Sequence, residues 1–340
     1  MPTYFDMGLR GSAESWRALR RRRATQPIPG DGGVARAETF RSSLEQAEQQ
    51  FAAAAIVGYD SRALNLFYGL SQAERALAAA APDGEWKLRG HGIEVRDLEV
   101  PDALALRLKP ARTRVDGNFT RLSTLLSSDV PAEFTLGEVW PLLVETVLHE
   151  RADSPTPAPL FVSVHAETVP NSGLSVTSAS LPLKGAYQPP GGSWWETGTV
   201  SLEDFMARYP QLRGWERDFP SGASVELPDP PSDHLRLRWT STELPGGPAA
   251  LQTRLTLYRG QRIAYPVVDG RADVMHPLLA WHAILFGLSM LTRYSPARWT
   301  RMIDVDHSRH ATLIEYVLDV ALDAVPDLID EAIETVTHTP

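Results

Sequence analysis

The sequence contains no cysteine, and its only lysines are Lys87, Lys109 and Lys184. Without cysteine, the chain can form no disulfide, thiolate nucleophile, cysteine-ligated zinc site or iron–sulfur cluster. It also lacks the glycine-rich patterns GxGxxG and GxxxxGK[ST], so neither dinucleotide binding nor P-loop chemistry is indicated. We therefore expect no cofactor and no metal centre.

An excess of positive charge is also missing. The net charge of −9 argues against a general nucleic-acid binder, because phosphate contacts need a basic face. Nucleic acid stays open as a partner only through local arginine patches such as Arg20–Arg23. The longest apolar run, Pro277–Leu291, is interrupted by His282 and is too short to span a bilayer. The first residues show no secretory-signal pattern, so we expect a cytoplasmic protein with no membrane partner.

The residues that are present predict an α+β fold. Hydrophobic residues make up 43% of the chain and charged residues 22%, which is typical of globular proteins. We expect the N- and C-terminal helices to pack together as a helical bundle, with a central, mainly antiparallel β segment. The expected parts are an extended N-terminal arm (1–42), a helical part with a short β excursion (43–155), a β-rich segment (156–270), and a C-terminal helical part packing on 43–155 (271–340).

Helix patterns dominate both ends of the chain. Apolar residues at helical spacing predict a helix over 40–59 and another that ends near Ala81, together an αα-hairpin. Thr135 and Glu138 stand three apart, as in a capping box, and predict a helix over 135–149. In the C-terminal part, the YSP and AVP sequences predict helix breaks, and the last helix is expected to carry an acidic outer face.

The central segment alternates between apolar and polar residues, as half-buried strands do. The clearest alternating stretches are LFVSVHAETV (160–169), HLRLRWTSTEL (234–244) and LQTRLTLYRGQRIAYPVV (251–268). Within the last of these, RGQ predicts a tight turn.

Four blocks occur in a characteristic order along the chain. They are NLFYGLSQAERALAAAA (65–81), GHGI (90–93), GNFTRLSTLL (117–126) and HPLLAWHAILFGLSMLTRYSPARW (276–299). Together they span most of the chain and resemble the YaaC-like family of bacterial proteins. The resemblance implies a bacterial, intracellular setting. It implies no activity and no catalytic residues.

The densest polar cluster is RYSPARWTRMIDVDHSRH (293–310). Five residues separate Arg301 from His307, which fits the Arg-x(4–6)-His spacing of HEPN-type ribonucleases. In that chemistry an arginine stabilises charge on the scissile phosphate and a histidine acts as acid or base. Alternatively, Arg293, Arg298 and Arg301 cap helix ends or pair with nearby carboxylates. The side chains that could instead ligate a metal are Asp304, Asp306, His307 and His310, although exposed loop polarity explains them better.

Trp194 and Trp195 are adjacent aromatic residues. In a strand they point to opposite faces, so at least one is exposed or meets a partner. They form either a binding patch or a pair in which one ring is buried and the other covers Pro189–Pro190. A further polar group at helical spacing, expected to form an internal network, comprises Tyr68, Gln72 and Arg75.

Two hypotheses for function therefore stay open. The first is a binding protein without catalytic machinery of its own, whose partner is a protein or a small molecule. The second is a HEPN-like ribonuclease, in a toxin or phage-defence setting, that uses Arg301 and His307. The sequence does not decide whether the chain is an enzyme or a homo-oligomer. The residues expected to bind in the first hypothesis are Trp194, Trp195, Arg293 and Arg298.

Overall fold

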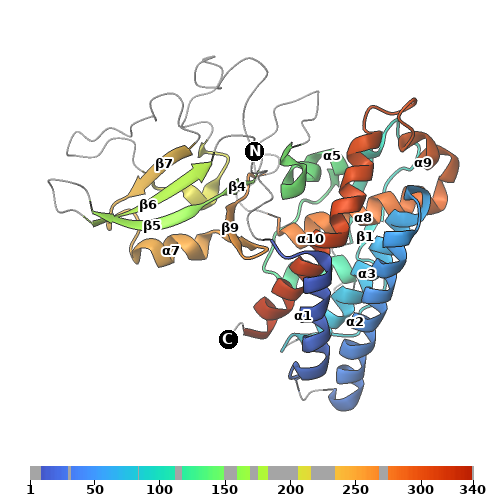
Figure 1. Cartoon of the computed structure of the whole chain (residues 1–340), viewed down its shortest axis with the longest axis horizontal. Helices are drawn as coiled ribbons and strands as arrows, with labels where there is room; N and C mark the ends of the chain where they lie inside the picture. The colour runs from blue at the N-terminus through green and yellow to red at the C-terminus, as the bar shows by residue number, and fades with distance from the viewer. Residues whose placement is uncertain are drawn as a thin grey trace. The chain divides into compact units, whose positions relative to one another are not determined.

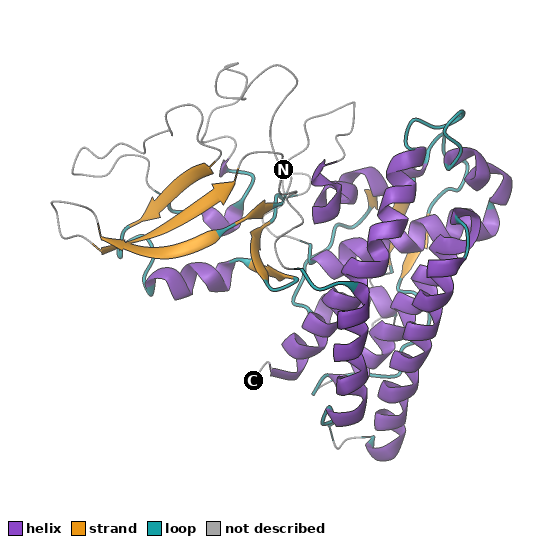
Figure 2. Cartoon of the chain, viewed as in Figure 1, coloured by secondary structure: helices purple, strands orange, loops and turns teal. Residues whose placement is uncertain are grey.

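The computed structural model describes residues 9–29, 32–82, 84–111, 117–148, 159–168, 175–182, 206–215, 234–267 and 275–338. The chain divides into two compact units, which we call the helical unit (1–146 and 275–340) and the β unit (147–274). Helices and small antiparallel sheets together confirm the predicted α+β fold (Figures 1 and 2). Trp194 and Trp195 lie outside the described residues.

The helical unit contains the predicted αα-hairpin. Helix α2 turns at Gly58 into α3, and the two helices run side by side (Figure 1). Helix α3 also contacts α8 and α10, so segments from both ends of the chain share one core. The α-helices of this unit are α1 (Ser12–Thr25), α2 (Gly33–Ile56), α3 (Tyr59–Ala80), α4 (Asn118–Leu125), α5 (Leu136–Val139), α8 (Pro277–Tyr294), α9 (Pro296–Met302) and α10 (Ala311–His338).

Helix α8 lies at the centre of the helical unit. Its residues from Pro277 to Ser289 are all buried, which explains why its sequence is apolar on every side. His276 caps the helix, because its Nδ1 accepts a hydrogen bond from the backbone N–H of Leu278 (3.1 Å). Burial lowers the pKa of His276 to about 4. The imidazole is therefore neutral at pH 7 and keeps the lone pair that the cap requires.

A small antiparallel sheet belongs to the same unit and leads into α5. The predicted capping box is confirmed: the Thr135 hydroxyl accepts from the N–H of Glu138, and the Glu138 carboxylate accepts from the N–H of Thr135. The helix predicted over 135–149 is too long, however, because Pro141 removes a backbone donor and the chain continues in 3₁₀ turns. These elements are β1 (Ile93–Val95), β2 (Arg107–Pro110), β3 (Phe134–Thr135), η1 (Ala103–Ala105), η2 (Trp140–Leu142) and η3 (Val144–Leu148).

The extended conformation predicted for residues 1–42 is wrong for most of that segment. Helix α1 spans Ser12–Thr25, and α2 already begins at Gly33. Trp16 and Leu19 of α1 are buried, so hydrophobic burial fixes α1 to the bundle. Three of the four arginines in the run 20–23 pair with acids of this unit: Arg20 with Glu48, Arg22 with Asp330 and Glu334, and Arg23 with Glu45.

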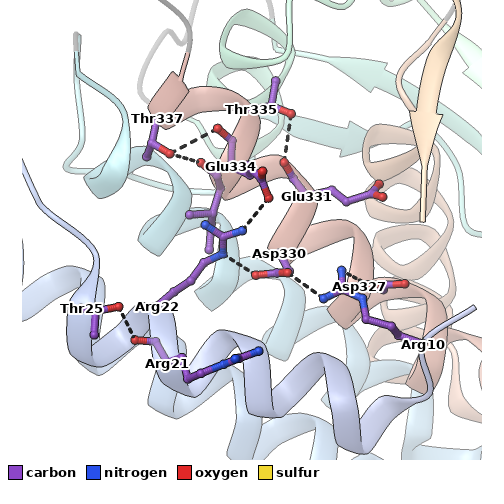
Figure 3. A network of polar contacts seen from close by, with 11 residues as sticks. Arg10, Arg21, Arg22, Thr25, Asp327, Asp330, Glu331, Glu334, Thr335 and Thr337 are labelled. Carbon is purple, nitrogen blue, oxygen red and sulfur yellow. Dashed lines mark hydrogen bonds and ion pairs between the residues drawn. The ribbon is translucent and has the colours of Figure 1, made fainter. Parts of the chain in front are cut away.

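Three aspartates of α10 lie on the face that α1 covers, while Glu334 is 63% exposed, so the acidic outer face predicted for this helix is only partly present. Asp330 is buried and pairs with both Arg10 and Arg22, while Asp327 lies 2.5 Å from Arg10 (Figure 3). Asp323 accepts a hydrogen bond from the first N–H of α1 (2.7 Å), where a helix favours negative charge. Aspartates 323, 327 and 330 recur every three or four residues and therefore share one helix face. The break predicted at AVP is also wrong, because Pro326 lies inside α10.

The β unit contains two antiparallel three-stranded sheets with the orders β5-β6-β7 and β4-β9-β8. Val164 lies opposite Ala179, and Ala179 opposite Leu237. Trp239 and Tyr209 are buried in the core of this unit. Its elements are β4 (Leu160–Phe161), β5 (Ser163–Thr168), β6 (Ser175–Pro182), η4 (Pro210–Leu212), β7 (His234–Trp239), α7 (Gly247–Arg254), β8 (Thr256–Tyr258) and β9 (Gln261–Ala264).

The tight turn predicted at RGQ joins β8 to β9. Tyr258 pairs with Gln261, and the two residues between them, Arg259 and Gly260, both have positive φ angles (49° and 79°). Such a turn matches the twist of a hairpin. The strand predicted to begin at residue 251 is wrong in its first four residues, which end helix α7.

Candidate functional site

A pocket of about 650 Å³ opens in the helical unit between α9, the loop that leads into α10, and the residues just before η1. Arg301 and His307 both line it, so the structure brings together the two residues singled out by their spacing. The helix break predicted at YSP creates this arrangement. Helix α8 ends at Tyr294, and α9 starts at Pro296, whose fixed φ suits a first helical position.

Three arginines line the pocket, and they are held differently. Arg298 is anchored: it pairs with Glu99, and its Nη1 donates to the carbonyl oxygen of Val100 (3.1 Å). Arg301, in the last turn of α9, is exposed and makes no hydrogen bond or ion pair with any residue that the structure describes. Arg309 follows in the loop before α10. Arg301 is therefore the cation with the greatest freedom to bind a ligand.

His307 is oriented by a carboxylate from its own loop. Its Nδ1 lies 2.7 Å from Oδ2 of Asp304, and Asp304 also accepts a hydrogen bond from the N–H of Asp306 (2.9 Å). These two hydrogen bonds, that from Asp306 first, lower the pKa of Asp304 below its ordinary value. An ionised Asp304 holds the proton of His307 on Nδ1, which leaves Nε2 for acid–base chemistry or for a ligand.

Asp102 and His310 bring a different chemistry to the same pocket. Oδ1 of Asp102 accepts hydrogen bonds from the N–H groups of Leu104 (2.8 Å) and Ala105 (3.2 Å), and so caps η1. Nδ1 of His310, a buried residue, lies 4.0 Å from that same oxygen. The pocket therefore contains one carboxylate among several cations. Its remaining lining residues are Pro101, Ser295, Pro296, Ala297, Met302 and Ser308.

The other predicted site residues stand apart from this pocket or in different roles. Arg293 is exposed and donates to the hydroxyl of Tyr68 (3.1 Å) instead of lining the pocket. Among the described residues, no group of three or more His, Asp or Glu side chains is placed to hold a metal ion. Sequence reasoning missed Asp102 and Arg309. Arg309 was within reach, because it stands between two residues that were considered, whereas nothing near Asp102 marks it.

A second polar cluster lies buried in the core of the helical unit. Oε1 of Glu74 accepts a hydrogen bond from Nδ1 of His282 (2.5 Å), and Oε2 accepts one from Nδ2 of Asn118 (3.0 Å). The Asn118 amide also donates to the hydroxyl of Ser71 (2.8 Å). All four side chains are buried, and His282 is 0% exposed. Because solvent has no access to it, we interpret this cluster as a polar link between α3, α4 and α8.

Aromatic rings and close backbone contacts enclose the buried cluster. The rings of Phe67 and Phe119 lie 5.6 and 5.1 Å from that of His282. Gly92 and Gly117 meet so closely that a Cβ on Gly117 would lie 2.4 Å from the Cα of Gly92. Gly92 of the GHGI sequence and Gly117 of the GNF sequence are thus required by a close crossing of two backbone segments, and this crossing positions Asn118.

The family assignment follows from a match over nearly the whole chain. The model of the YaaC-like protein family matches residues 19–333. The chain belongs to the YaaC-like family. All four YaaC-like blocks recognised in the sequence contribute to the buried cluster or to the backbone crossing that encloses it. All residues that line the pocket also lie within the part of the chain that the family model matches.

Other comparisons add no closer parallel. Neither the search of curated proteins nor the search of solved structures found a match. Within the described part of this YaaC-like chain, no helix is both long enough and apolar enough to cross a membrane.

Proposed function

We propose that this YaaC-like protein is a binding protein whose pocket takes an anionic, phosphate-bearing ligand. The observation that carries the proposal is Arg301, an exposed arginine at the pocket that pairs with no described residue. A guanidinium is always charged and matches the oxygens of a phosphate in a bidentate manner. A bacterial, cytoplasmic setting belongs to the same proposal, as does a ligand that is a small molecule.

The charges around the pocket support an anion. Arg298, Arg301 and Arg309 line the pocket together with the carboxylate of Asp102, and Asp304, bound to His307, adds a second negative charge beside it. Arg298 is already neutralised by Glu99, so the excess of positive charge is smaller than the number of arginines suggests. The chain as a whole carries a charge of −9, which makes a local positive site an exception on this protein.

Replacing Arg301 by glutamine tests the proposal. We expect the variant to bind inorganic phosphate at least about tenfold more weakly than the wild type, because one charge-assisted contact is lost. Isothermal titration calorimetry at low and high salt measures this, and wild-type affinity should fall as salt screens the charges. Arg41→Gln, which removes an exposed arginine from α2, is the matched control. Equal affinities in wild type and Arg301→Gln would overturn the proposal.

A second candidate function is the ribonuclease. Arg301 and His307 line the same pocket, and Asp304 orients the imidazole of His307, as a general acid or base requires. This hypothesis predicts that expression of the wild type slows growth and that the purified protein cleaves RNA. His307→Ala should abolish both effects, while His165→Ala, in the β unit, should abolish neither. A wild type that leaves growth normal and RNA intact excludes this candidate.

A further inference from the structure

We infer that the ligand of this pocket is a single ribonucleoside phosphate, with Asp102 as the residue that selects its sugar. The inference rests on the proposed function, because it assumes that Arg301 binds the phosphate. It goes beyond the proposed function because it also identifies the part of the ligand that is attached to the phosphate. The arginines alone do not define that part.

Asp102 is the first argument. A site built only for an anion gains nothing from a carboxylate, which repels phosphate. Asp102 nevertheless lines the pocket, and its side chain is 34% exposed there. Its Oδ1 is occupied by the two N–H groups of η1, whereas Oδ2 makes no hydrogen bond with a described residue. Oδ2 can therefore accept a hydrogen bond from a ligand that carries a donor beside its phosphate.

Ribose hydroxyls fit this requirement. Carboxylates recognise the 2′-hydroxyl of ribose in dinucleotide-binding proteins, where the hydroxyl donates to the acid. A hydroxyl lies within one sugar ring of a 5′-phosphate, so one small pocket can hold both groups. His310, buried beside Asp102, adds a second polar side chain at the same end of the pocket.

The size and the apolar wall of the pocket are the second argument. A volume of about 650 Å³ suits one small ligand, and not a polymer strand, which needs an extended groove. Three exposed lining residues offer apolar surface on which a flat base can rest. They are Pro101, Pro296 and Ala297.

The test compares ligands and variants by isothermal titration calorimetry on the full chain. The ligands are inorganic phosphate, the four ribonucleoside 5′-monophosphates, and the 2′-deoxy analogue of the tightest of them. The variant is Asp102→Asn, which keeps an oxygen to cap η1 but removes the negative charge. Asp97→Asn is the matched control, because Asp97 also accepts a backbone hydrogen bond (from the N–H of Glu99, 2.8 Å) but does not line the pocket.

We expect one ribonucleotide to bind the wild type at least about tenfold more tightly than phosphate does. Asp102→Asn should reduce that advantage to less than about threefold without weakening the binding of phosphate, and the 2′-deoxy analogue should lose affinity to the same extent. The inference is overturned if no ribonucleotide binds better than phosphate, or if Asp102→Asn leaves the preference intact. The proposed function then still stands, provided that Arg301→Gln weakens phosphate binding. If no phosphate compound binds, the proposed function itself fails.

Discussion

Glu74→Ala is expected to lower the free energy of unfolding by about 1–3 kcal/mol, the usual cost of leaving a buried hydrogen-bonding group without its partner. The carboxylate of Glu74 accepts hydrogen bonds from His282 and Asn118, and all three side chains are buried. Without Glu74, the Nδ1–H of His282 loses its acceptor in an aromatic environment, whereas the Asn118 amide keeps its hydrogen bonds to Ser71. Urea denaturation followed by circular dichroism at 222 nm measures the loss, since most of the helical signal comes from the helical unit.

Two further variants make this result interpretable. Glu38→Ala removes an exposed glutamate from α2 and should change the free energy of unfolding by less than about 0.5 kcal/mol. Glu74→Gln retains one acceptor oxygen and should fall between Glu74→Ala and the wild type. A loss below about 1 kcal/mol in Glu74→Ala would contradict a structural role for the buried cluster.

The double variant Arg10→Ala/Arg22→Ala is expected to destabilise the attachment of α1 by about 3–5 kcal/mol. Buried Asp330 pairs with both arginines, so the double variant leaves its charge without either partner (Figure 3). We expect the amides of α1 to exchange hydrogen much faster, because the helix is then held only by its buried residues, such as Trp16 and Leu19, and by its exposed polar contacts. Hydrogen exchange read by mass spectrometry resolves α1 from the rest of the chain.

Arg17→Ala/Arg21→Ala is the matched control for this experiment. It removes the same number of positive charges, here both from α1, but both of its arginines are exposed. Its amides in α1 should exchange at nearly the wild-type rate. Adding Asp330→Asn to the Arg10/Arg22 variant should recover part of the protection, since a neutral amide costs less to bury than an unpaired carboxylate. Equal exchange in the two double variants would show that charge count, and not the pairing of Asp330, holds α1.

Local features of the fold were predictable from sequence because short-range chemistry determines them. The αα-hairpin, the capping box of Thr135 and Glu138, and the turn at Arg259–Gly260 each depend on residues a few positions apart. The length of the helix after Thr135 was predicted wrongly because its apolar spacing continues past Pro141, and spacing does not distinguish α from 3₁₀ turns. Helix α1 was missed because polar residues and arginines obscure its short buried stripe.

Only those pocket residues that lie close together in the sequence could be predicted. Arg301 and His307 fall within one loop and helix, so their spacing brought them together correctly. Asp102 reaches the pocket from about 200 positions earlier, and no local pattern marks such a contact. The buried network was expected around Tyr68, Gln72 and Arg75. Its centre is instead Glu74, since the partners that bury an acid, His282 and Asn118, come from other helices.

During synthesis, some of the helices that pack against each other in the helical unit do not emerge from the ribosome one after another. Helix α3 needs α8 and α10 to cover its apolar face, but residues 147–274 are made between them. At typical synthesis rates of about 5–20 residues per second, roughly 10–40 s separate α3 from α8. During that interval the face of the α2–α3 hairpin that packs on α8 and α10 has no cover from them. Nascent chains of this protein should therefore depend on chaperones most strongly before residue 277 is added.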